Sequence, residues 1–246
     1  MRKSTGMATS RFDSSWETNI YSKGLQINRY PYGELVSVFF RGLKHLRTRV
    51  ASRNQTRILE IGCGAGNNLQ FFCQEGFAVY GIDGSRSACE IANKQLSSLG
   101  YSTVVKQAEF DDLPFGDQHF DIIVDREATY CGRIEDIRQT WREADRVLKL
   151  GGLVISFFFA DDHPDCVEAG QNPEFARELE PNTFTDFQSG GFAGSGIAHF
   201  ASYEELLDIF GFLDIKLITK HSSRAVIDSQ DGGRGYSEWI LVGVKK

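Results

Sequence analysis

The chain has 246 residues, of which 41% are hydrophobic and 24% are charged, and its formal net charge is −6. That length is sufficient to bury a substantial core in one large domain or two small ones. The acidic balance disfavours a general nucleic-acid-binding surface, for which clustered basic residues are typical. Five cysteines without a CxxC pair disfavour a zinc site or a disulfide framework, and they indicate reduced thiols in a cytoplasmic protein.

The N-terminal stretch MRKSTGMATSRFDSS carries basic residues but no apolar segment behind them, so we expect no secretory signal. No run in the chain approaches the roughly 20 apolar residues that a membrane-spanning helix needs. We therefore predict that residues 1–10 are disordered, with Met7 as an alternative start, and that the protein has no membrane partner.

Residues 11–56 precede the first predicted strand and form a predicted N-terminal helical segment. Within residues 32–46, apolar side chains such as Leu35, Val38 and Phe39 recur at helical spacing. This spacing indicates a helix with one apolar face.

From residue 57 onward, apolar runs typical of buried strands alternate with amphipathic helical patterns. Strands are predicted at 57–62, 77–83, 101–108, 119–125, 153–159, 213–219 and 236–244. Helices are predicted at 67–75, 85–99, 134–150 and 203–210, and Gly151-Gly152 is expected to end the third of these. This alternation predicts an α/β domain over residues 57–246, with a seven-stranded, mostly parallel sheet covered on both faces.

Residues 160–201 interrupt the alternation after the fifth strand with a long segment rich in Gly, Asp and Phe. A connection of this length in a compact domain is usually functional or mobile. We expect this insertion to lie on the substrate side of the domain.

The stretch ILEIGCGAGNNLQFF, residues 58–72, places Gly62, Gly64 and Gly66 between a predicted strand and a predicted helix. Glycines there permit a tight turn and close approach of a ligand to the backbone. Dinucleotide-binding folds use a similar pattern. A phosphate-binding loop is disfavoured because no GK[ST] follows.

Carboxylates around the glycines indicate the kind of ligand. Asp83 ends the next strand about twenty residues later, where a carboxylate can accept both ribose hydroxyls. Glu60 precedes the glycines and Glu109 follows the third strand, and neither position suits a pair of bound phosphates. The pattern therefore indicates a ligand with an adenosine end and a positively charged, phosphate-free other end.

The segments LEIGCGAGNN, VYGIDGS, AEFDDLPF, FDIIVD and READRVLKLGGLVISFF resemble the ordered motifs of class I S-adenosylmethionine-dependent methyltransferases. The resemblance covers residues 57 to about 160 closely and the final strand pair loosely. It implies a Rossmann-like fold and S-adenosyl-L-methionine as the methyl donor.

The resemblance also implies roles for individual residues around that donor. The glycine loop lies under the methionine and ribose part, Asp83 binds the ribose hydroxyls, and Glu109 and Phe110 lie at the adenine. Glu109 stands where Asp is commoner, which leaves open whether Glu109 or Asp111 contacts the adenine. The expected donor-binding residues are Trp16, Tyr21, Glu60, Gly62, Cys63, Gly64, Gly66, Asn67, Asp83, Gly84, Ser85, Glu109, Phe110 and Asp125.

Aromatic residues are crowded into the segment before the first strand. Rings beside a sulfonium stabilise its charge, and this family often folds an N-terminal helix over the donor. We predict that residues 11–56 form a lid with Trp16 and Tyr21 near the methionine end. The alternative is a segment that packs only on the edge of the sheet.

The acceptor side is expected at the carboxyl ends of the strands and in the insertion. Candidate catalytic bases are Asp125, His163 and His199, although each histidine also fits a hydrogen-bonded loop position. Arg126, Tyr130 and His163 are the expected substrate-contacting residues. Residues 161–165 form an acidic stretch, which we interpret as a solvated loop, and we predict no metal.

We predict a methyltransferase acting at oxygen or nitrogen of a small molecule, such as a sugar or secondary metabolite, as a monomer or homodimer. Residues 125–130 read DREATY and not [DNS]PP[YFW], which disfavours amino methylation of nucleic-acid bases. One alternative is a nicotinamide-dependent oxidoreductase, although no Tyr-x-x-x-Lys pair follows a central strand. The other is a non-catalytic module that serves a partner protein.

Overall fold

The computed structural model describes residues 13–48, 52–224 and 235–246. The predicted disorder of residues 1–10, and Met7, lie outside the described residues. In the described ranges, no helix has the length and apolar character required to cross a membrane.

Seven strands form one sheet in the order β3-β2-β1-β4-β5-β10-β9. β1 to β5 are parallel to one another, whereas β10 runs antiparallel to both β5 and β9. The strands are β1 (Arg57–Ile61), β2 (Ala78–Asp83), β3 (Val104–Gln107), β4 (Phe120–Arg126), β5 (Leu148–Phe159), β9 (Leu213–Ser223) and β10 (Tyr236–Lys245). The predicted mostly parallel, seven-stranded α/β sheet is confirmed for the described part of the chain.

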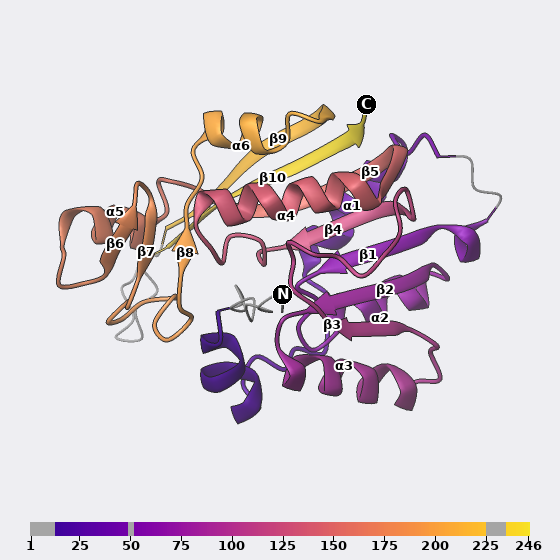
Figure 1. Cartoon of the computed structure of the whole chain (residues 1–246), viewed down its shortest axis with the longest axis horizontal. Coiled ribbons are helices and arrows are strands. Elements are labelled where there is room, and N and C mark those ends of the chain that lie inside the picture. The colour runs from indigo at the N-terminus through magenta and orange to yellow at the C-terminus, as the bar shows by residue number, and fades with distance from the viewer. Residues whose placement is uncertain (1–12, 49–51, 225–234) are drawn as a thin grey trace, which may run out of the picture.

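Helices cover both faces of this sheet, so its central strands are buried on both sides. α4 lies in front of the sheet, and α1 and α2 lie behind it (Figure 1). The apolar positions of α4 recur at helical spacing and are buried, as with Ile137, Trp141 and Ala144. The helices are α1 (Gly33–Leu43), α2 (Asn67–Gln74), α3 (Arg86–Ser98), α4 (Ile134–Val147), α5 (Pro164–Gln171) and α6 (Tyr203–Ile209), with short turns η1 (Trp16–Ile20), η2 (Tyr21–Lys23) and η3 (Arg53–Gln55).

The predicted end of α4 at Leu150 was wrong, because the helix ends at Val147 and Leu148 already pairs with Phe120 in the sheet. β5 continues through both glycines. Gly151 has φ +74°, and a Cβ there would lie 2.9 Å from the Cβ of Arg47. This glycine therefore permits the chain after α1 to pack against the strand, and it does not end a helix.

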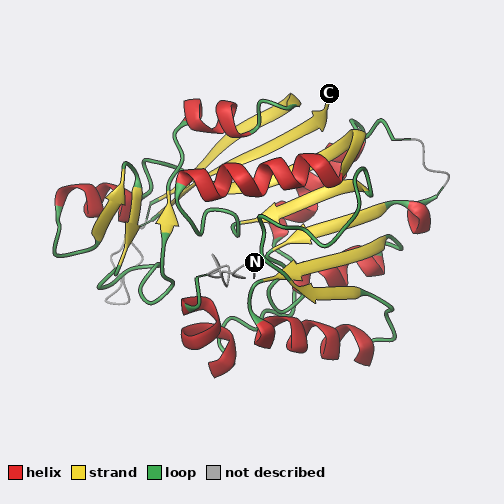
Figure 2. Ribbon diagram, in the orientation of Figure 1, coloured by secondary structure: helices red, strands yellow, loops and turns green. Residues whose placement is uncertain are grey.

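The insertion at residues 160–201 is folded, with secondary structure that the sequence patterns did not predict. It contains α5 and a small antiparallel sheet in the order β6-β7-β8, which stands apart from the main sheet (Figure 2). Its strands are β6 (Arg177–Glu180), β7 (Thr183–Thr185) and β8 (Ala198–His199). Buried phenylalanines, among them Phe184, Phe192 and Phe200, join it to the core in front of the main sheet.

Candidate active site

Two adjoining cavities open beyond the carboxyl ends of β1, β2 and β4. The first cavity contains about 800 Å³ of empty space with its open mouth included, and the second contains about 1340 Å³. Both are lined by Trp16, Tyr21, Gly62 and Glu127. A ligand in the first cavity therefore borders directly on the second.

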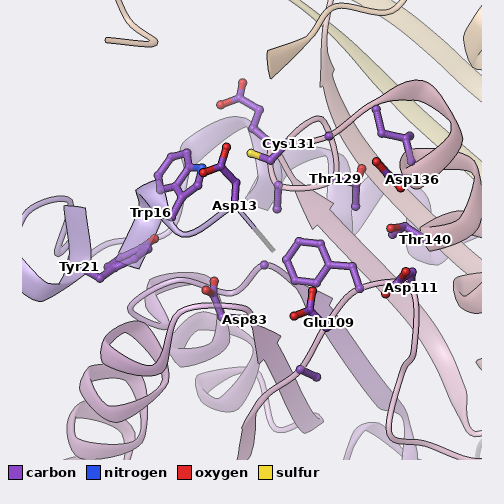
Figure 3. A pocket seen from close by; sticks show the side chains of 17 residues that line it. Asp13, Trp16, Tyr21, Asp83, Glu109, Asp111, Thr129, Cys131, Asp136 and Thr140 are labelled. Atoms are coloured by element: carbon purple, nitrogen blue, oxygen red, sulfur yellow. The ribbon is translucent and has the colours of Figure 1, made fainter. Parts of the chain in front are cut away.

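The lining of the first cavity is strongly acidic. Asp83 and Glu109 lie on one side, and Trp16 and Asp13 lie across from them (Figure 3). Among its described lining residues there is no Lys, Arg or His, and the acidic ones are Asp13, Asp83, Glu109, Asp111, Glu127 and Asp136. Because like charges repel, this lining disfavours phosphates and favours a cationic or hydroxyl-bearing ligand.

The glycine loop fits closely against its neighbours at the floor of both cavities. Gly62 and Gly64 have φ values of +66° and +51°, which residues with a Cβ rarely adopt. A Cβ at Gly62 would lie 2.1 Å from the Cβ of Ala128, and one at Gly64 would lie 2.5 Å from the Tyr21 hydroxyl. Glycine is therefore required at both positions.

Asp83 ends β2 and is held by backbone amides. Its Oδ2 accepts from the Gly64 N–H at 2.9 Å, and its Oδ1 accepts from the Ser85 N–H at 2.8 Å. Burial raises the pKa of this carboxyl to about 6, although both amides act in the opposite direction. Each oxygen keeps a second acceptor position, so the carboxylate can bind a pair of hydroxyls in the first cavity.

Glu60 is a buried carboxyl with one unsatisfied oxygen. Its Oε1 accepts from the Asn68 side chain at 2.7 Å, and its Oε2 has no hydrogen-bond partner among the residues that the structure describes. Burial raises its pKa to about 8. Glu60 lines the second cavity together with Cys63, Gly64 and Asn67, so its free oxygen is suited to a donor group of a ligand.

The predicted adenine side is formed by the residues after β3. Ala108, Glu109, Phe110 and Asp111 all line the first cavity. Glu109 lies on the same side as Asp83, whereas Asp111 lies beside Thr140 (Figure 3). Of the two carboxylates, Glu109 is therefore the one that lies at the Asp83 end of the cavity.

Four predicted donor-binding residues line neither cavity: Gly66, Gly84, Ser85 and Asp125. Gly66 begins α2, and a Cβ there would lie 3.0 Å from the Cβ of Ala92 in α3. The carbonyl of Gly84 accepts from the Gln107 side chain, and the Ser85 hydroxyl accepts from the N–H of Ala88 at the start of α3. These contacts fix the elements that carry Asp83 and the glycine loop.

Asp125, predicted as a donor-binding residue and candidate base, also lines neither cavity. Its Oδ1 accepts from the backbone N–H groups of Ala128 and Thr129, both at 3.1 Å. Its Oδ2 accepts from the hydroxyls of Thr129 and Ser156, at 2.9 Å and 2.8 Å. The fully buried Asp125 side chain therefore braces the turn after β4, and its acceptor positions are in use.

Glu127, which the sequence patterns did not single out, lines both cavities at that turn. Its carboxylate pairs with Arg126, whose guanidinium carbon lies 4.1 Å from the ring centre of Tyr32. Burial raises the pKa of Glu127 to about 8, and Glu238 of β10 adds to the increase. The available signal was a second carboxylate directly after the strand end, in DREATY.

The two candidate histidines occupy different places. His163 lines the second cavity with Tyr130, and its Nδ1 accepts from the Asp165 N–H at 3.1 Å. Burial lowers the pKa of His163, so its ring is neutral with the proton on Nε2. His199 is buried against the Thr183 hydroxyl at 2.7 Å and lines neither cavity.

The N-terminal segment, residues 13–30, is attached to both sides of the site. Glu17 accepts from the Ser85 hydroxyl at 2.6 Å and from the Ser87 hydroxyl at 2.7 Å, at the start of α3. Asn19 donates to the Gly194 carbonyl in the insertion at 3.0 Å. The segment thereby holds Trp16 at the boundary of the two cavities, and no sequence pattern singled out Glu17 for this attachment.

Groups of three or more His, Cys, Asp or Glu side chains arranged to hold a metal ion are absent from the described ranges. The residues present do fit a cationic nucleoside. Asp83 can bind hydroxyls, the acidic walls suit positive charge, and the unsatisfied oxygen of Glu60 suits an ammonium group.

A family model described as a methyltransferase domain matches residues 59–156, which include the glycine loop and Asp83. The chain is 33% identical over 113 residues to the uncharacterized methyltransferase YcgJ of Bacillus subtilis (strain 168), covering 45% of this chain and 44% of that protein. The chain spans about half the length of the curated relatives it matches, or less.

The fold is similar to that of a SAM-dependent methyltransferase from Methanosarcina mazei, with a TM-score of 0.67 at 19% identity, covering 88% of this chain and 98% of that one. It is also similar to Burkholderia thailandensis 1,6-didemethyltoxoflavin-N1-methyltransferase, with a TM-score of 0.64 at 11% identity, covering 94% and 84%. These likenesses show the fold alone. Taken with the matched domain, they agree with the sequence motifs: residues 59–156 are similar to a methyltransferase domain, and the fold is similar to that of SAM-dependent methyltransferases.

Proposed function

We propose that this protein binds S-adenosylmethionine in the first cavity, with the methionine end reaching Glu60 on the glycine-loop side of the second cavity, and methylates a small molecule held in the rest of the second. The observation that carries the proposal is the shared boundary of the two cavities, formed by Trp16, Tyr21, Gly62 and Glu127. A donor and an acceptor in adjoining cavities can meet there without crossing bulk water.

The donor supplies an activated methyl group on a positively charged sulfur. The residues of this chain then have three tasks, which are to bind the donor, align the acceptor and exclude water. Asp83 binds the ribose hydroxyls and Glu60 the ammonium end. The rings of Trp16 and Tyr21, with centres 6.2 Å apart, cover the boundary and stabilise positive charge there.

The second cavity favours an acceptor with both a flat apolar part and polar groups. Phe159, Phe192 and Tyr236 form aromatic walls around His163, with ring centres 5.4–5.7 Å from its ring. The Nε2–H group of the neutral His163 ring is the hydrogen-bond donor that this aromatic wall offers to the acceptor molecule. We infer methylation at oxygen or nitrogen of such a molecule, and a cytoplasmic location and a monomer or homodimer remain predictions.

Calorimetric titration with S-adenosylmethionine tests the donor site directly. We expect wild-type protein to bind the donor, and Asp83→Asn to bind it roughly 10- to 150-fold more weakly, since a charge-assisted hydrogen-bond pair contributes about 1.5–3 kcal/mol. Asp186→Asn is the matched control, because Asp186 pairs with Arg177 on the exposed surface of the insertion. Absence of binding by the wild type would contradict the proposal.

Two further measurements separate the alternative functions. Titration with NADH should give no binding, and tight NADH binding without S-adenosylmethionine binding would favour the oxidoreductase. Transfer of a tritiated methyl group to a panel of small phenols, alcohols, amines and sugars should reveal an acceptor. Donor binding with no transfer to any member would favour the non-catalytic module.

A further inference from the structure

We propose that Glu127, paired with Glu238 and held by Arg126, takes the proton that the acceptor loses on methylation. This inference rests on the proposed function. It assigns the acceptor to molecules whose reacting oxygen or nitrogen carries a proton, which are hydroxyl compounds and protonated or N–H-bearing amines and heterocycles.

The position of Glu127 is fixed by its backbone. The residue has φ +49°, a left-handed conformation that is uncommon outside glycine. Its N–H donates to the Phe157 carbonyl of β5 at 3.2 Å, and Asp125 holds the next two backbone N–H groups. Such a conformation persists only where the surroundings determine it, and it clusters at functional sites. Here it directs a carboxylate to the boundary of the two cavities.

The charges around Glu127 form a small buried cluster of two carboxyls and one guanidinium. The Arg126 and Glu127 side chains are only 13% and 14% exposed, and Glu238 is 5% exposed. Glu238 accepts from the Tyr236 hydroxyl at 2.9 Å, whereas Oε1 of Glu127 receives no N–H or hydroxyl hydrogen bond from the described residues and is left to the Glu238 carboxyl. One arginine cannot neutralise two buried carboxylates, so the pair retains a proton that either carboxyl can hold.

The ionisation of Glu127 and Glu238 depends on burial, on Arg126 and on several titratable groups of the surrounding elements. Burial raises the pKa of both Glu127 and Glu238, and Arg126 lowers both. The titratable groups that act on the pair from the surrounding elements are Tyr130 of the β4–α4 turn, His221 of β9, Tyr236 of β10, Glu34 of α1 and Tyr32, which packs on Arg126. The ionisation of Glu127 is therefore sensitive to any cation that enters the boundary.

When the sulfonium enters the boundary, the carboxyl pair releases its retained proton to solvent and Glu127 is ionised. The acceptor O–H or N–H bond then breaks and its proton passes to the Glu127 carboxylate. The electron pair left on oxygen or nitrogen forms the bond to the methyl carbon, the carbon–sulfur bond breaks, and its electrons remain on sulfur. No oxidant or metal is needed. The added proton is shared with Glu238 until it leaves to solvent.

The experiment compares S-adenosylmethionine with S-adenosylhomocysteine, which lacks the methyl group and the positive charge on sulfur. Affinities for both are measured by calorimetry from pH 6 to pH 9. If Glu127 must ionise beside the sulfonium, the affinity ratio of the charged to the neutral ligand increases by up to about tenfold per pH unit and levels off near pH 8. In Glu127→Gln the ratio should be independent of pH.

Glu60→Gln is the matched control, because Glu60 is also a buried carboxyl of raised pKa but lines only the second cavity. Both ligands carry the same ammonium group, so this variant should keep the wild-type dependence of the ratio on pH. A ratio flattened by Glu60→Gln and retained by Glu127→Gln would overturn the assignment.

The outcomes separate the two proposals. Failure of either ligand to bind the wild type contradicts the proposed function, whereas binding with a pH-independent ratio overturns only the role of Glu127. If Glu127→Gln does not fold, the dependence of the affinity ratio on pH in the wild type and in Glu238→Gln still tests the role of Glu127. Glu238→Gln removes the partner that raises the pKa of Glu127, so the rise in the ratio should move to lower pH. An unchanged profile in that variant contradicts the shared pair.

Discussion

Asp125, near the end of β4, and Glu127, directly after the strand, stand two residues apart and have opposite surroundings. Every acceptor bond of Asp125 is made to its own turn and to β5, while Oε1 of Glu127 receives no N–H or hydroxyl hydrogen bond from the described residues. The position of Asp125 at a strand end predicted a catalytic base, because such ends face the ligand in open α/β sheets. The buried hydrogen bonds instead indicate a structural role.

Substitution of Asp125 distinguishes the two roles. Asp125→Ala leaves two hydroxyls and two backbone N–H groups without their acceptor, so we expect a loss of about 3 kcal/mol in unfolding free energy. Asp125→Asn retains one carbonyl oxygen for the N–H groups and an amide for the hydroxyls, and should cost about 1 kcal/mol. Urea denaturation measures both. Abolished methyl transfer in a fully stable Asp125→Asn would restore Asp125 as the base.

Sequence patterns predicted some of the site residues, but they did not predict the roles of others. Asp83 and the glycine loop were predictable because their spacing follows from the strand–turn–helix geometry that brings them together. The roles of Asp125 and Glu127 were not, because they depend on which acceptor positions Thr129 and Ser156 occupy. Ser156 lies in a strand 31 residues away, and no local pattern records that contact.

At the scale of elements, the N-terminal segment depends on Glu17 to hold η1 against α3. Glu17 places a carboxylate at the N-terminal end of α3, where the helix dipole and the Ser87 N–H favour an anion. The pKa of Glu17 is lowered by hydrogen bonds from Ser85 and Ser87, in agreement with this arrangement. Loss of this contact should loosen the segment that carries Trp16 and Tyr21.

We expect Glu17→Ala to weaken S-adenosylhomocysteine binding by roughly 2- to 10-fold, because an anion at a helix N-terminus contributes about 0.3–1 kcal/mol and the hydroxyl bonds add to it. Trypsin cleavage after Lys23 and Arg29 should become faster in the variant. Glu90→Ala is the control, since Glu90 pairs with Arg86 on the exposed side of the same helix. Equal effects of both substitutions would argue against a specific attachment.

The main sheet was predictable because its strands are long apolar runs separated by amphipathic helices. The insertion was not, because β7 and β8 have only three and two residues, too few for a periodic pattern. The boundary between α4 and β5 was misplaced for a related reason. Leu148 and Leu150 continue the helical spacing, and only pairing with Phe120 across the sheet assigns Leu148 to a strand.

At the scale of the whole molecule, the carboxyls gathered at one edge of the sheet make stability depend on pH. Glu60 and Glu127 both have pKa values raised to about 8 by burial. The folded state therefore binds protons that the unfolded state has released, so this contribution to stability is complete below about pH 4.5 and is lost as pH rises through 8. Histidines oppose this trend only up to about pH 6.5, because their folded pKa values are lowered.

We therefore expect the unfolding free energy of the ligand-free protein to fall between pH 7 and pH 8, by up to about 1.4 kcal/mol for each of the two groups. Glu60→Gln should remove roughly half of that slope in urea denaturation. Glu135→Gln is the control, because Glu135 lies on the exposed side of α4 and pairs with Arg142. A wild-type stability that does not change over this range would contradict the raised pKa values.

The bond between Asn19 and Gly194 joins residues 175 positions apart, and it has a consequence for how the protein is made. A ribosome releases residues 13–30 early but the loop that anchors them only after most of the chain has been synthesised. Until then the aromatic segment is attached only within the earlier part of the domain, to α3 through Glu17 and to Asn67 through the Tyr30 carbonyl. Because contacts of high sequence separation form late, this segment is made before most of the domain and is among the last parts to reach its final place.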